Sequence, residues 1–143
     1  MARLTDMGIE PYLVASSVQG VIAQRLVRRV CQKCHEAVDL PDDILEEVRL
    51  LFPDHVGTPH FVRGRGCPDC KFTGYKGRLA VFEILMVDQT LHALVVRNAS
   101  SDEIRRAAVE KGMETLRRNA WQAALNGITT AEEVMRVTPS EML

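Results

Sequence analysis

Two segments of the chain alternate between apolar and polar residues, and this period of two predicts β-strands. The first, VIAQRLVRRV (residues 21–30), is rich in β-branched and aliphatic side chains and runs directly into Cys31. A strand here places on one face Ile22, Gln24, Leu26, Arg28 and Val30. The segment GRLAVFEILMV (residues 77–87) predicts a second long strand, and HFVRGRG (residues 60–66) predicts a short extended segment.

Three segments in the first half of the chain predict helices. Residues 41–53, PDDILEEVRLLFP, carry acids in the first turn and have an apolar face made of Ile44, Leu45, Val48 and Leu51. Residues 1–10 have the form of a helix end closed by Gly8. Residues 10–20, EPYLVASSVQG, predict a short helix with Pro11 in its first turn.

Four helices are predicted after residue 87 from their start and stop signals. Two of them begin with a capping box, in which a Ser or Thr and a Glu three residues later satisfy each other's backbone N–H groups. In chain order the start signals are Asp88, Ser100 with Glu103, Thr115, and Thr130 with Glu133. The stop signals of the last three helices are Gly112, Gly127 and Pro139.

Composition places the chain among globular proteins, with 46% hydrophobic and 26% charged residues in 143. The net charge of −1 gives no electrostatic argument for binding nucleic acid or an anionic membrane. The longest uncharged stretch, PYLVASSVQGVIAQ, is shorter than the roughly 20 residues of a membrane span, and no basic segment precedes it as in a signal peptide. We therefore expect a cytosolic protein without a membrane span, in which structural disulfides are rare.

All four cysteines fall in two C-x-x-C pairs, and each pair follows a segment predicted to be extended. Two such knuckles can build a tetrahedral site of four thiolates, which predicts a structural zinc held by Cys31, Cys34, Cys67 and Cys70. Iron in a rubredoxin-like site is the alternative metal. Four sulfur ligands leave no position for water, so the site is predicted to be closed and not catalytic. Nearby histidines that could replace a ligand, but are expected to be surface or packing residues, are His35, His55 and His60.

A cluster of basic residues surrounds the cysteines, and its simplest role is to offset the negative charge of the thiolates. It consists of Lys33, Arg63, Arg65, Lys71, Lys76 and Arg78. A nucleic-acid-binding zinc ribbon is a competing interpretation, which the near-neutral total charge and the few nearby aromatic residues for base stacking disfavour. A thiol redox protein is a third interpretation, but it needs a single C-x-x-C at a helix start and not two matched pairs.

No motif for catalysis is found in this segment. It has no Walker A loop, no H-E-x-x-H and no G-x-S-x-G, and no cysteine remains to act as a nucleophile. The acidic pairs Asp42/Asp43 and Glu46/Glu47 are expected to form a solvated helix face.

Three blocks in order carry a family resemblance: DMGIEPYLVASSVQGVIAQRLVRRVCQKC, GCPDCKFTGYKGRLAVFEIL and GITTAEEVMRVT. They resemble the C-terminal part of the type II secretion ATPases, general secretory pathway protein E, with the pilus-assembly ATPases of type IV pili as near relatives. The resemblance implies an α/β fold made of the last elements of a RecA-like P-loop ATPase domain, an inserted zinc-ribbon-like subdomain and a helical C-terminal tail. It divides the chain into 1–30 (ATPase core), 31–76 (tetracysteine subdomain) and 77–143 (returning strand and helical region).

The resemblance also implies a function for the longer parent protein. Family members are cytoplasmic hexamers that dock on inner-membrane platform proteins and use ATP and magnesium to drive assembly of a pseudopilus. Their Walker A, Asp-box, Walker B and His-box motifs lie upstream of the matching segment. We therefore expect a protein peripheral to the bacterial inner membrane, with no nucleic-acid partner, and a segment that is inactive on its own.

Two arginines are implied to lie near the nucleotide in the parent. Arg3 falls in a block similar to the family's R-L-x-D-M-G sequence, and Arg78 opens GRLAVFEIL. Retraction ATPases that lack the cysteines resemble this second block too, so it is expected to serve the ATPase core and not the metal. The alternative for Arg78 is a structural salt bridge with a carboxylate such as Glu83.

Overall fold

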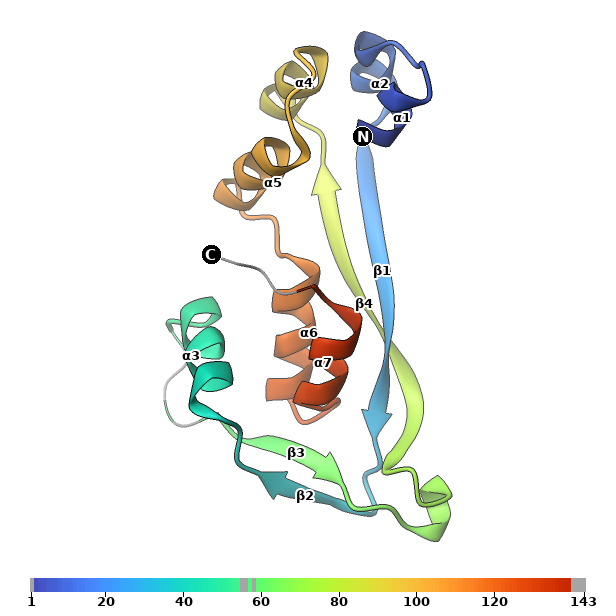
Figure 1. Cartoon of the computed structure of the whole chain (residues 1–143), viewed down its shortest axis with the longest axis vertical. Coiled ribbons are helices and arrows are strands. Elements are labelled where there is room, and N and C mark those ends of the chain that lie inside the picture. Colours follow the sequence, from blue (N-terminus) through green and yellow to red (C-terminus); the bar gives the residue numbers. More distant parts are fainter. Residues whose placement is uncertain (1, 55–56, 58, 140–143) are drawn as a thin grey trace. The chain divides into compact units, whose positions relative to one another are not determined.

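The computed structural model describes residues 2–54, 57 and 59–139, which form a mixture of helices and strands (Figure 1). In chain order the elements are α1 (Ala2–Asp6), α2 (Pro11–Ser17), β1 (Gly20–Val30), β2 (His35–Val38), α3 (Asp42–Leu51), β3 (Phe61–Gly64), the 3-10 turn η1 (Pro68–Cys70), β4 (Tyr75–Met86), α4 (Gln89–Val96), α5 (Ser101–Glu110), α6 (Leu116–Leu125) and α7 (Ala131–Val137). The chain divides into two compact units, Met1–Ala23 with Phe82–Thr115 (unit 1) and Gln24–Val81 with Leu116–Leu143 (unit 2). Among the described residues, no helix is both long and apolar enough to span a bilayer.

Unit 1 is built around the packing of α2 on α4 and of α4 on α5. Its core consists of Val14, Ala15, Leu91, Leu94, Val95, Ile104 and Ala108. The predicted cap of α4 is confirmed, because the Asp88 side chain accepts a hydrogen bond from the backbone N–H of Leu91 at 2.9 Å. At α5 only half of the predicted capping box forms. Ser100 accepts from the N–H of Glu103 at 3.2 Å, but the Glu103 carboxylate forms an ion pair with Arg97.

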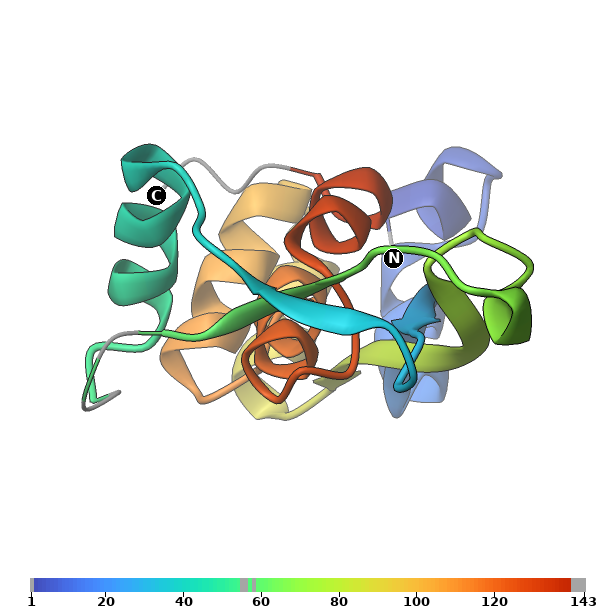
Figure 2. The same cartoon turned by 90° about the horizontal axis from the view of Figure 1, so that it is seen from below.

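Unit 2 has a larger core centred on Trp121, which is fully buried and meets Phe61 edge to face at 5.9 Å between ring centroids. Strand β2 pairs antiparallel with β3, from His35 opposite Gly64 to Val38 opposite Phe61. Figure 2 shows this pair beside α6, which packs on both β3 and α7. The other core residues are Val27, Val48, Val81, Ala120, Ala123, Ala124, Ala131 and Val134. Strand β2 was not predicted, because four residues are too few to show a period.

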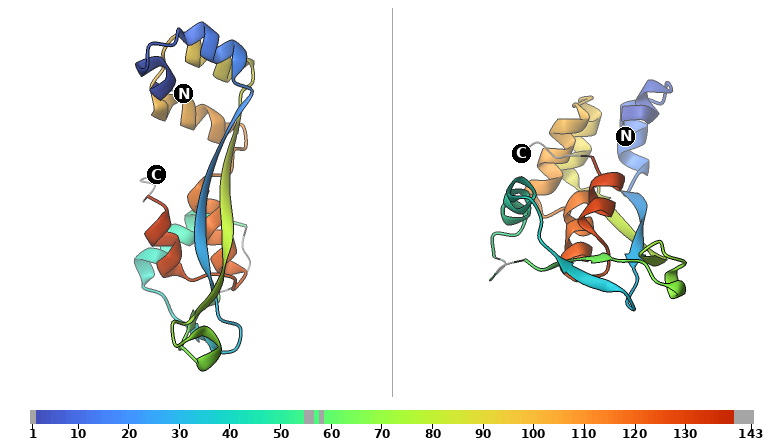
Figure 3. Two further views of the ribbon diagram at one scale, coloured as in Figure 1. Left: turned by 90° about the vertical axis from the view of Figure 1, so that its right-hand side faces the viewer. Right: turned by 60° about the horizontal axis from the view of Figure 1, so that its bottom comes forward.

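The two long predicted strands are present, and β1 pairs with β4 as a two-stranded sheet (Figure 3). The residues predicted to share one face of β1 differ in burial. Ile22 and Leu26 are exposed, whereas Val27 and Val30 are buried. Burial does not alternate regularly at the end of β1, where Val30 also donates its N–H to the carbonyl of Ile128 at 2.9 Å.

The acidic face predicted for α3 is only partly solvated. Asp42, Asp43 and Glu46 are exposed as expected. Glu47 is not, because its carboxylate accepts hydrogen bonds from the buried Arg117 of α6 and from the indole N–H of Trp121 at 3.0 Å. The hydrogen bonds from Arg117 hold the pKa of Glu47 below its usual range despite an opposing effect of burial.

Candidate metal centre

Four separate segments of unit 2 bring the cysteines together. Cys31 follows β1 directly, Cys34 precedes β2, Cys67 caps η1 and Cys70 ends it. All four sulfur atoms lie within 4.8 Å of one another, and no other metal-binding cluster of His, Cys, Asp or Glu occurs among the described residues. Cys31, Cys34 and Cys70 are buried, whereas Cys67 is partly exposed. The spatial gathering of the thiols that the paired spacing predicts is therefore present.

The sulfur positions fit a tetrahedral metal site. The printed Sγ–Sγ distances are 3.9 Å for Cys31 and Cys67, 3.9 Å for Cys34 and Cys70, and 3.8 Å for Cys67 and Cys70. A tetrahedron with zinc–sulfur bonds of about 2.3 Å has edges of about 3.8 Å. These distances are far too long for disulfide bonds, whose length is about 2.05 Å. The four thiols could thus bind a metal ion such as zinc.

The second knuckle depends on tight backbone packing. Lys71 and Phe72 both adopt left-handed conformations, with φ of 53° and 61°, which wrap the chain around Cys70. This turn lets the N–H groups of Cys67 and Gly74 donate to the Cys70 sulfur at 3.2 Å and 3.3 Å. A side chain at Gly64 would lie 2.1 Å from the Gly74 carbonyl oxygen, so the close approach of β3 to this turn requires glycine.

The protein environment shifts the pKa values of two of the thiols in opposite directions. Burial raises the pKa of Cys34 to about 12, and its three cysteine neighbours act in the same direction. Burial also disfavours the charged form of Cys70, but the backbone N–H donors from Cys67 and Gly74 outweigh it and lower this pKa to about 6. A bound divalent cation would supply the positive charge needed to keep all four groups as thiolates.

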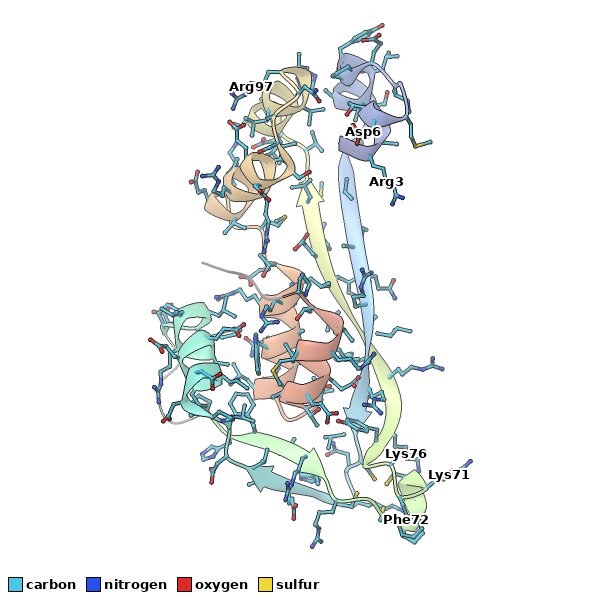
Figure 4. The ribbon with its side chains drawn as sticks, viewed as in Figure 1. Arg3, Asp6, Lys71, Phe72, Lys76 and Arg97 are labelled. Atoms are coloured by element: carbon cyan, nitrogen blue, oxygen red, sulfur yellow. The ribbon has the colours of Figure 1, made fainter. Side chains whose placement is uncertain are left out.

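Most of the predicted basic cluster is paired with carboxylates around the site. Lys33 and Lys76 both contact Asp69, at 3.1 Å and 2.7 Å. Arg63 and Arg65 both contact Glu36, at 2.9 Å and 3.3 Å. Figure 4 shows Lys71 and Phe72 projecting outward from the turn. Four of the six cations are thus paired with two carboxylates, and their expected role in offsetting the charge of thiolates stays a prediction.

The histidines considered as alternative ligands lie outside the cluster where they are described. His35 is exposed, and its Nδ1 lies 2.9 Å from the carbonyl oxygen of Gln32. His60 is exposed as well. His55 falls outside the described residues. The described histidines therefore fit the expected surface role.

The two arginines implied to lie near a nucleotide belong to different units. Arg3 is an exposed residue of α1 in unit 1, and Arg78 is an exposed residue of β4 in unit 2. Their role toward a nucleotide stays a prediction. The alternative for Arg78, a salt bridge with a carboxylate such as Glu83, stays a prediction as well.

The structure is a mixed α/β fold in which four cysteines lie close enough together to bind a metal ion. Residues 1–136 match the family model described as type II/IV secretion system protein, and the chain belongs to that family. The resemblance to type II secretion and type IV pilus ATPases is thereby confirmed.

Individual relatives come from both kinds of secretion machinery. The chain is 41% identical over 138 residues to the type IV pilus assembly ATPase PilB of Thermus thermophilus, covering 96% of this chain and 15% of that protein. It is 40% identical over 141 residues to type II secretion system protein E of Pseudomonas aeruginosa, covering 99% of this chain and 27% of that protein. It is 40% identical over 139 residues to the type II secretion system ATPase E of Vibrio cholerae, covering 96% and 27%. The chain thus spans between 15% and 27% of the length of these relatives.

Proposed function

We propose that this chain is the tetracysteine-bearing segment of a longer ATPase that drives pseudopilus assembly and protein export through a type II secretion system. The observation that carries the proposal is the family match over residues 1–136, which includes all four cysteines. The parent would be a cytoplasmic hexamer at the inner membrane, bound to platform proteins. ATP and magnesium would bind outside this segment, in which no phosphate-binding loop occurs.

Zinc is the metal that the donor set fits best. Four thiolates at tetrahedral spacing are typical of structural zinc, and Cys31, Cys34, Cys67 and Cys70 would hold the ion. The ion would supply a cross-link between β1 and the loop before β4, and no reaction would take place on it. The residues of unit 2 provide the remaining support through backbone hydrogen bonds to sulfur.

Exposed apolar residues on the strands of unit 1 support the proposal that these strands belong to a larger domain in the parent protein. Apolar residues at alternate positions of β4, Phe82, Ile84 and Met86, are 42%, 51% and 67% exposed. Ile22 of β1 is 65% exposed. Apolar strand residues in contact with water are costly, and the core of a RecA-like ATPase domain would cover them. The parent's RecA-like fold is accordingly part of the proposal.

A type IV pilus assembly ATPase is the alternative parent. The identities of 41% and 40% to a pilus ATPase and to a secretion ATPase are too similar to choose between them. A nucleic-acid-binding ribbon is less favoured, because four of the six cations near the cysteines already contact carboxylates.

ATP hydrolysis by the longer protein, and its absence from this chain alone, tests the proposed function. The isolated chain should show no turnover above background, because no group in it can hold the β- and γ-phosphates with magnesium. A preparation of the protein encoded by the complete reading frame should hydrolyse ATP in a coupled phosphate-release assay. Turnover by the purified segment, or an inactive and folded complete protein, would contradict the proposal.

Substitution of Arg78 tests whether this residue serves the nucleotide in the parent. We expect Arg78→Ala to weaken ATP binding or turnover about 10- to 100-fold, the effect of losing one charge-assisted contact of roughly 1.5–3 kcal/mol. Arg78→Lys should recover little activity, because lysine lacks the planar fork of donors. Zinc content and assembly should not change. Arg49→Ala, which removes another exposed arginine of unit 2, is the matched control. Normal activity of Arg78→Ala, or loss of zinc, would rule the role out.

A further inference from the structure

Unit 2, which contains the thiol cluster, also contains a carboxylate that is completely removed from solvent. The side chain of Glu133, in the first turn of α7, is 0% exposed and accepts five hydrogen bonds. Three come from Arg28 of β1: its backbone N–H at 2.7 Å, its Nε at 3.0 Å and its Nη2 at 2.8 Å. The other two come from Nε and Nη2 of Arg136, both at 2.7 Å.

These donors keep the buried group charged. Burial on its own would raise the pKa of Glu133, but the hydrogen bonds from Arg136 and Arg28 outweigh it and lower the pKa to about 2. A buried charge of this kind is retained only where its geometry is satisfied, since removing a partner leaves an uncompensated ion. Apolar residues could fill the same space without directional bonds. The directional hydrogen bonds to Glu133 therefore restrict the position of Arg28 more than hydrophobic packing would.

Arg28 in turn holds the start of β4. Its guanidinium carbon lies 4.0 Å from the centroid of the Tyr75 ring, a cation–π distance. The Tyr75 hydroxyl lies 2.9 Å from the hydroxyl of Thr130, the residue that caps α7. On the other side, the Thr129 hydroxyl donates to the Arg28 carbonyl at 2.8 Å. The end of β1 and the start of β4 thus both form hydrogen bonds with residues at the beginning of α7.

Arg28 and Tyr75 lie close in sequence to one pair of cysteines each. Gly74, next to Tyr75, donates its N–H to the Cys70 sulfur at 3.3 Å and accepts the N–H of Cys31 at 2.9 Å through its carbonyl. Arg28 lies in β1, three positions before Cys31, which directly follows that strand. A displacement of Arg28 or Tyr75 therefore changes the alignment of one knuckle against the other.

We propose that Glu133 is a positioning residue for the metal site, which acts through Arg28 and Tyr75 to hold the two cysteine pairs at tetrahedral spacing. This inference rests on the proposed zinc site and extends it to a residue of α7 that lies far from all four cysteines in the sequence. Loss of the Glu133 charge loosens the alignment of the pairs. The bound ion then dissociates more easily, even while the rest of unit 2 stays folded.

Zinc release from the 143-residue chain is the experiment. Zinc-loaded protein is mixed with an excess of a chromophoric chelator, and the release rate is measured for wild type, Glu133→Gln and Glu47→Gln. Glu47→Gln is the matched control, because it neutralises another carboxylate of unit 2 that is paired with an arginine. Outer-shell substitutions typically change metal affinity about 10- to 100-fold, so we expect at least about tenfold faster release for Glu133→Gln. The Glu47→Gln rate should equal that of wild type.

Replacing zinc with cobalt gives a second measurement, which reports the geometry of the metal site and does not change with the stability of the fold alone. Visible absorption of the cobalt–thiolate site should shift for Glu133→Gln and should match wild type for Glu47→Gln. Should Glu133→Gln fail to fold, Arg136→Gln removes two of the five donors from an exposed side chain and should still raise the release rate.

The outcomes distinguish failure of the proposed zinc site from failure of the proposed role of Glu133. Wild-type protein that binds no metal overturns the proposed zinc site itself. Wild-type protein that binds zinc, with release from Glu133→Gln or Arg136→Gln no faster than wild type, overturns only the role of Glu133. Equal acceleration by Glu133→Gln and Glu47→Gln also overturns it, because release would then follow general loss of stability.

Discussion

One zinc ion per chain is expected when the protein is purified without chelators and analysed by native mass spectrometry with elemental analysis. The expectation follows from four thiols whose sulfur atoms lie within 4.8 Å of one another. Zinc binding to small structural sites contributes on the order of 10 kcal/mol to folding. Removal of the ion with a strong chelator should therefore unfold the segment around the two knuckles.

Cys67→Ser tests the same site without a chelator. The substitution removes one of four ligands and also the sulfur beside which η1 begins. We expect loss of the metal and loss of hydrogen-exchange protection from Cys67 to Tyr75, because the backbone N–H groups of Cys67 and Gly74 donate to a sulfur of this turn and both cysteines of the pair lie in it. Protection in α4 and α5 should persist, since their core lies in unit 1 and contains no cysteine.

His35→Ala is the control for Cys67→Ser, since His35 is exposed and lies outside the thiol cluster. This variant should keep one zinc ion and the wild-type exchange pattern. If the protein is folded at neutral pH without a bound metal, the prediction of a structural zinc is wrong. Stoichiometric iron with visible absorption would instead assign the site to the rubredoxin-like alternative.

The thiol cluster could be predicted because its information is local. Each C-x-x-C pair sets its own turn, and the strands β1 before the first pair and β4 after the second are long enough to show their periods. Asp88 before α4 was recognisable for the same reason, since a cap acts within three residues of itself. The helices that begin after Ser100 and Thr130 carry equally local signals.

The ionic network around the cluster could not be predicted, because its partners are far apart in the chain. Glu133 was interpreted as the reciprocal member of a capping box with Thr130, and its spacing fits that role. In the structure Thr130 does accept the N–H of Glu133 at 3.3 Å, but the carboxylate binds Arg28, 105 positions away. No signal in a single sequence distinguishes a solvated glutamate from one that a distant arginine will bury. Glu47 was misassigned to the solvated face for the same reason.

The second large effect is expected for Arg117→Ala, which should destabilise unit 2 by about 3 kcal/mol. Arg117 is 5% exposed and binds both oxygens of Glu47, and its Nη1 donates to the Thr138 hydroxyl at 3.2 Å and the Pro139 carbonyl at 3.2 Å. It thereby joins α3, α6 and the segment after α7. Its removal takes two donors from the partly buried Glu47 carboxylate, which keeps the indole N–H of Trp121, and it removes this donor from the carbonyl groups of Thr138 and Pro139.

Trp121 provides the probe for this measurement, because it is the chain's one tryptophan, is fully buried and donates its indole N–H to Glu47. Urea unfolding of zinc-saturated protein, followed by Trp121 fluorescence, gives the free energy of unfolding of unit 2. A double-mutant cycle with Glu47→Ala should show coupling of more than about 1 kcal/mol, since a pair screened by solvent rarely exceeds that value. Replacing both residues with leucine should restore much of the stability, because the cost lies in leaving one charge unpaired and not in losing the pair. An effect of Arg117→Ala no larger than that of Arg49→Ala, on the exposed face of α3, would show that the network contributes nothing beyond a surface ion pair.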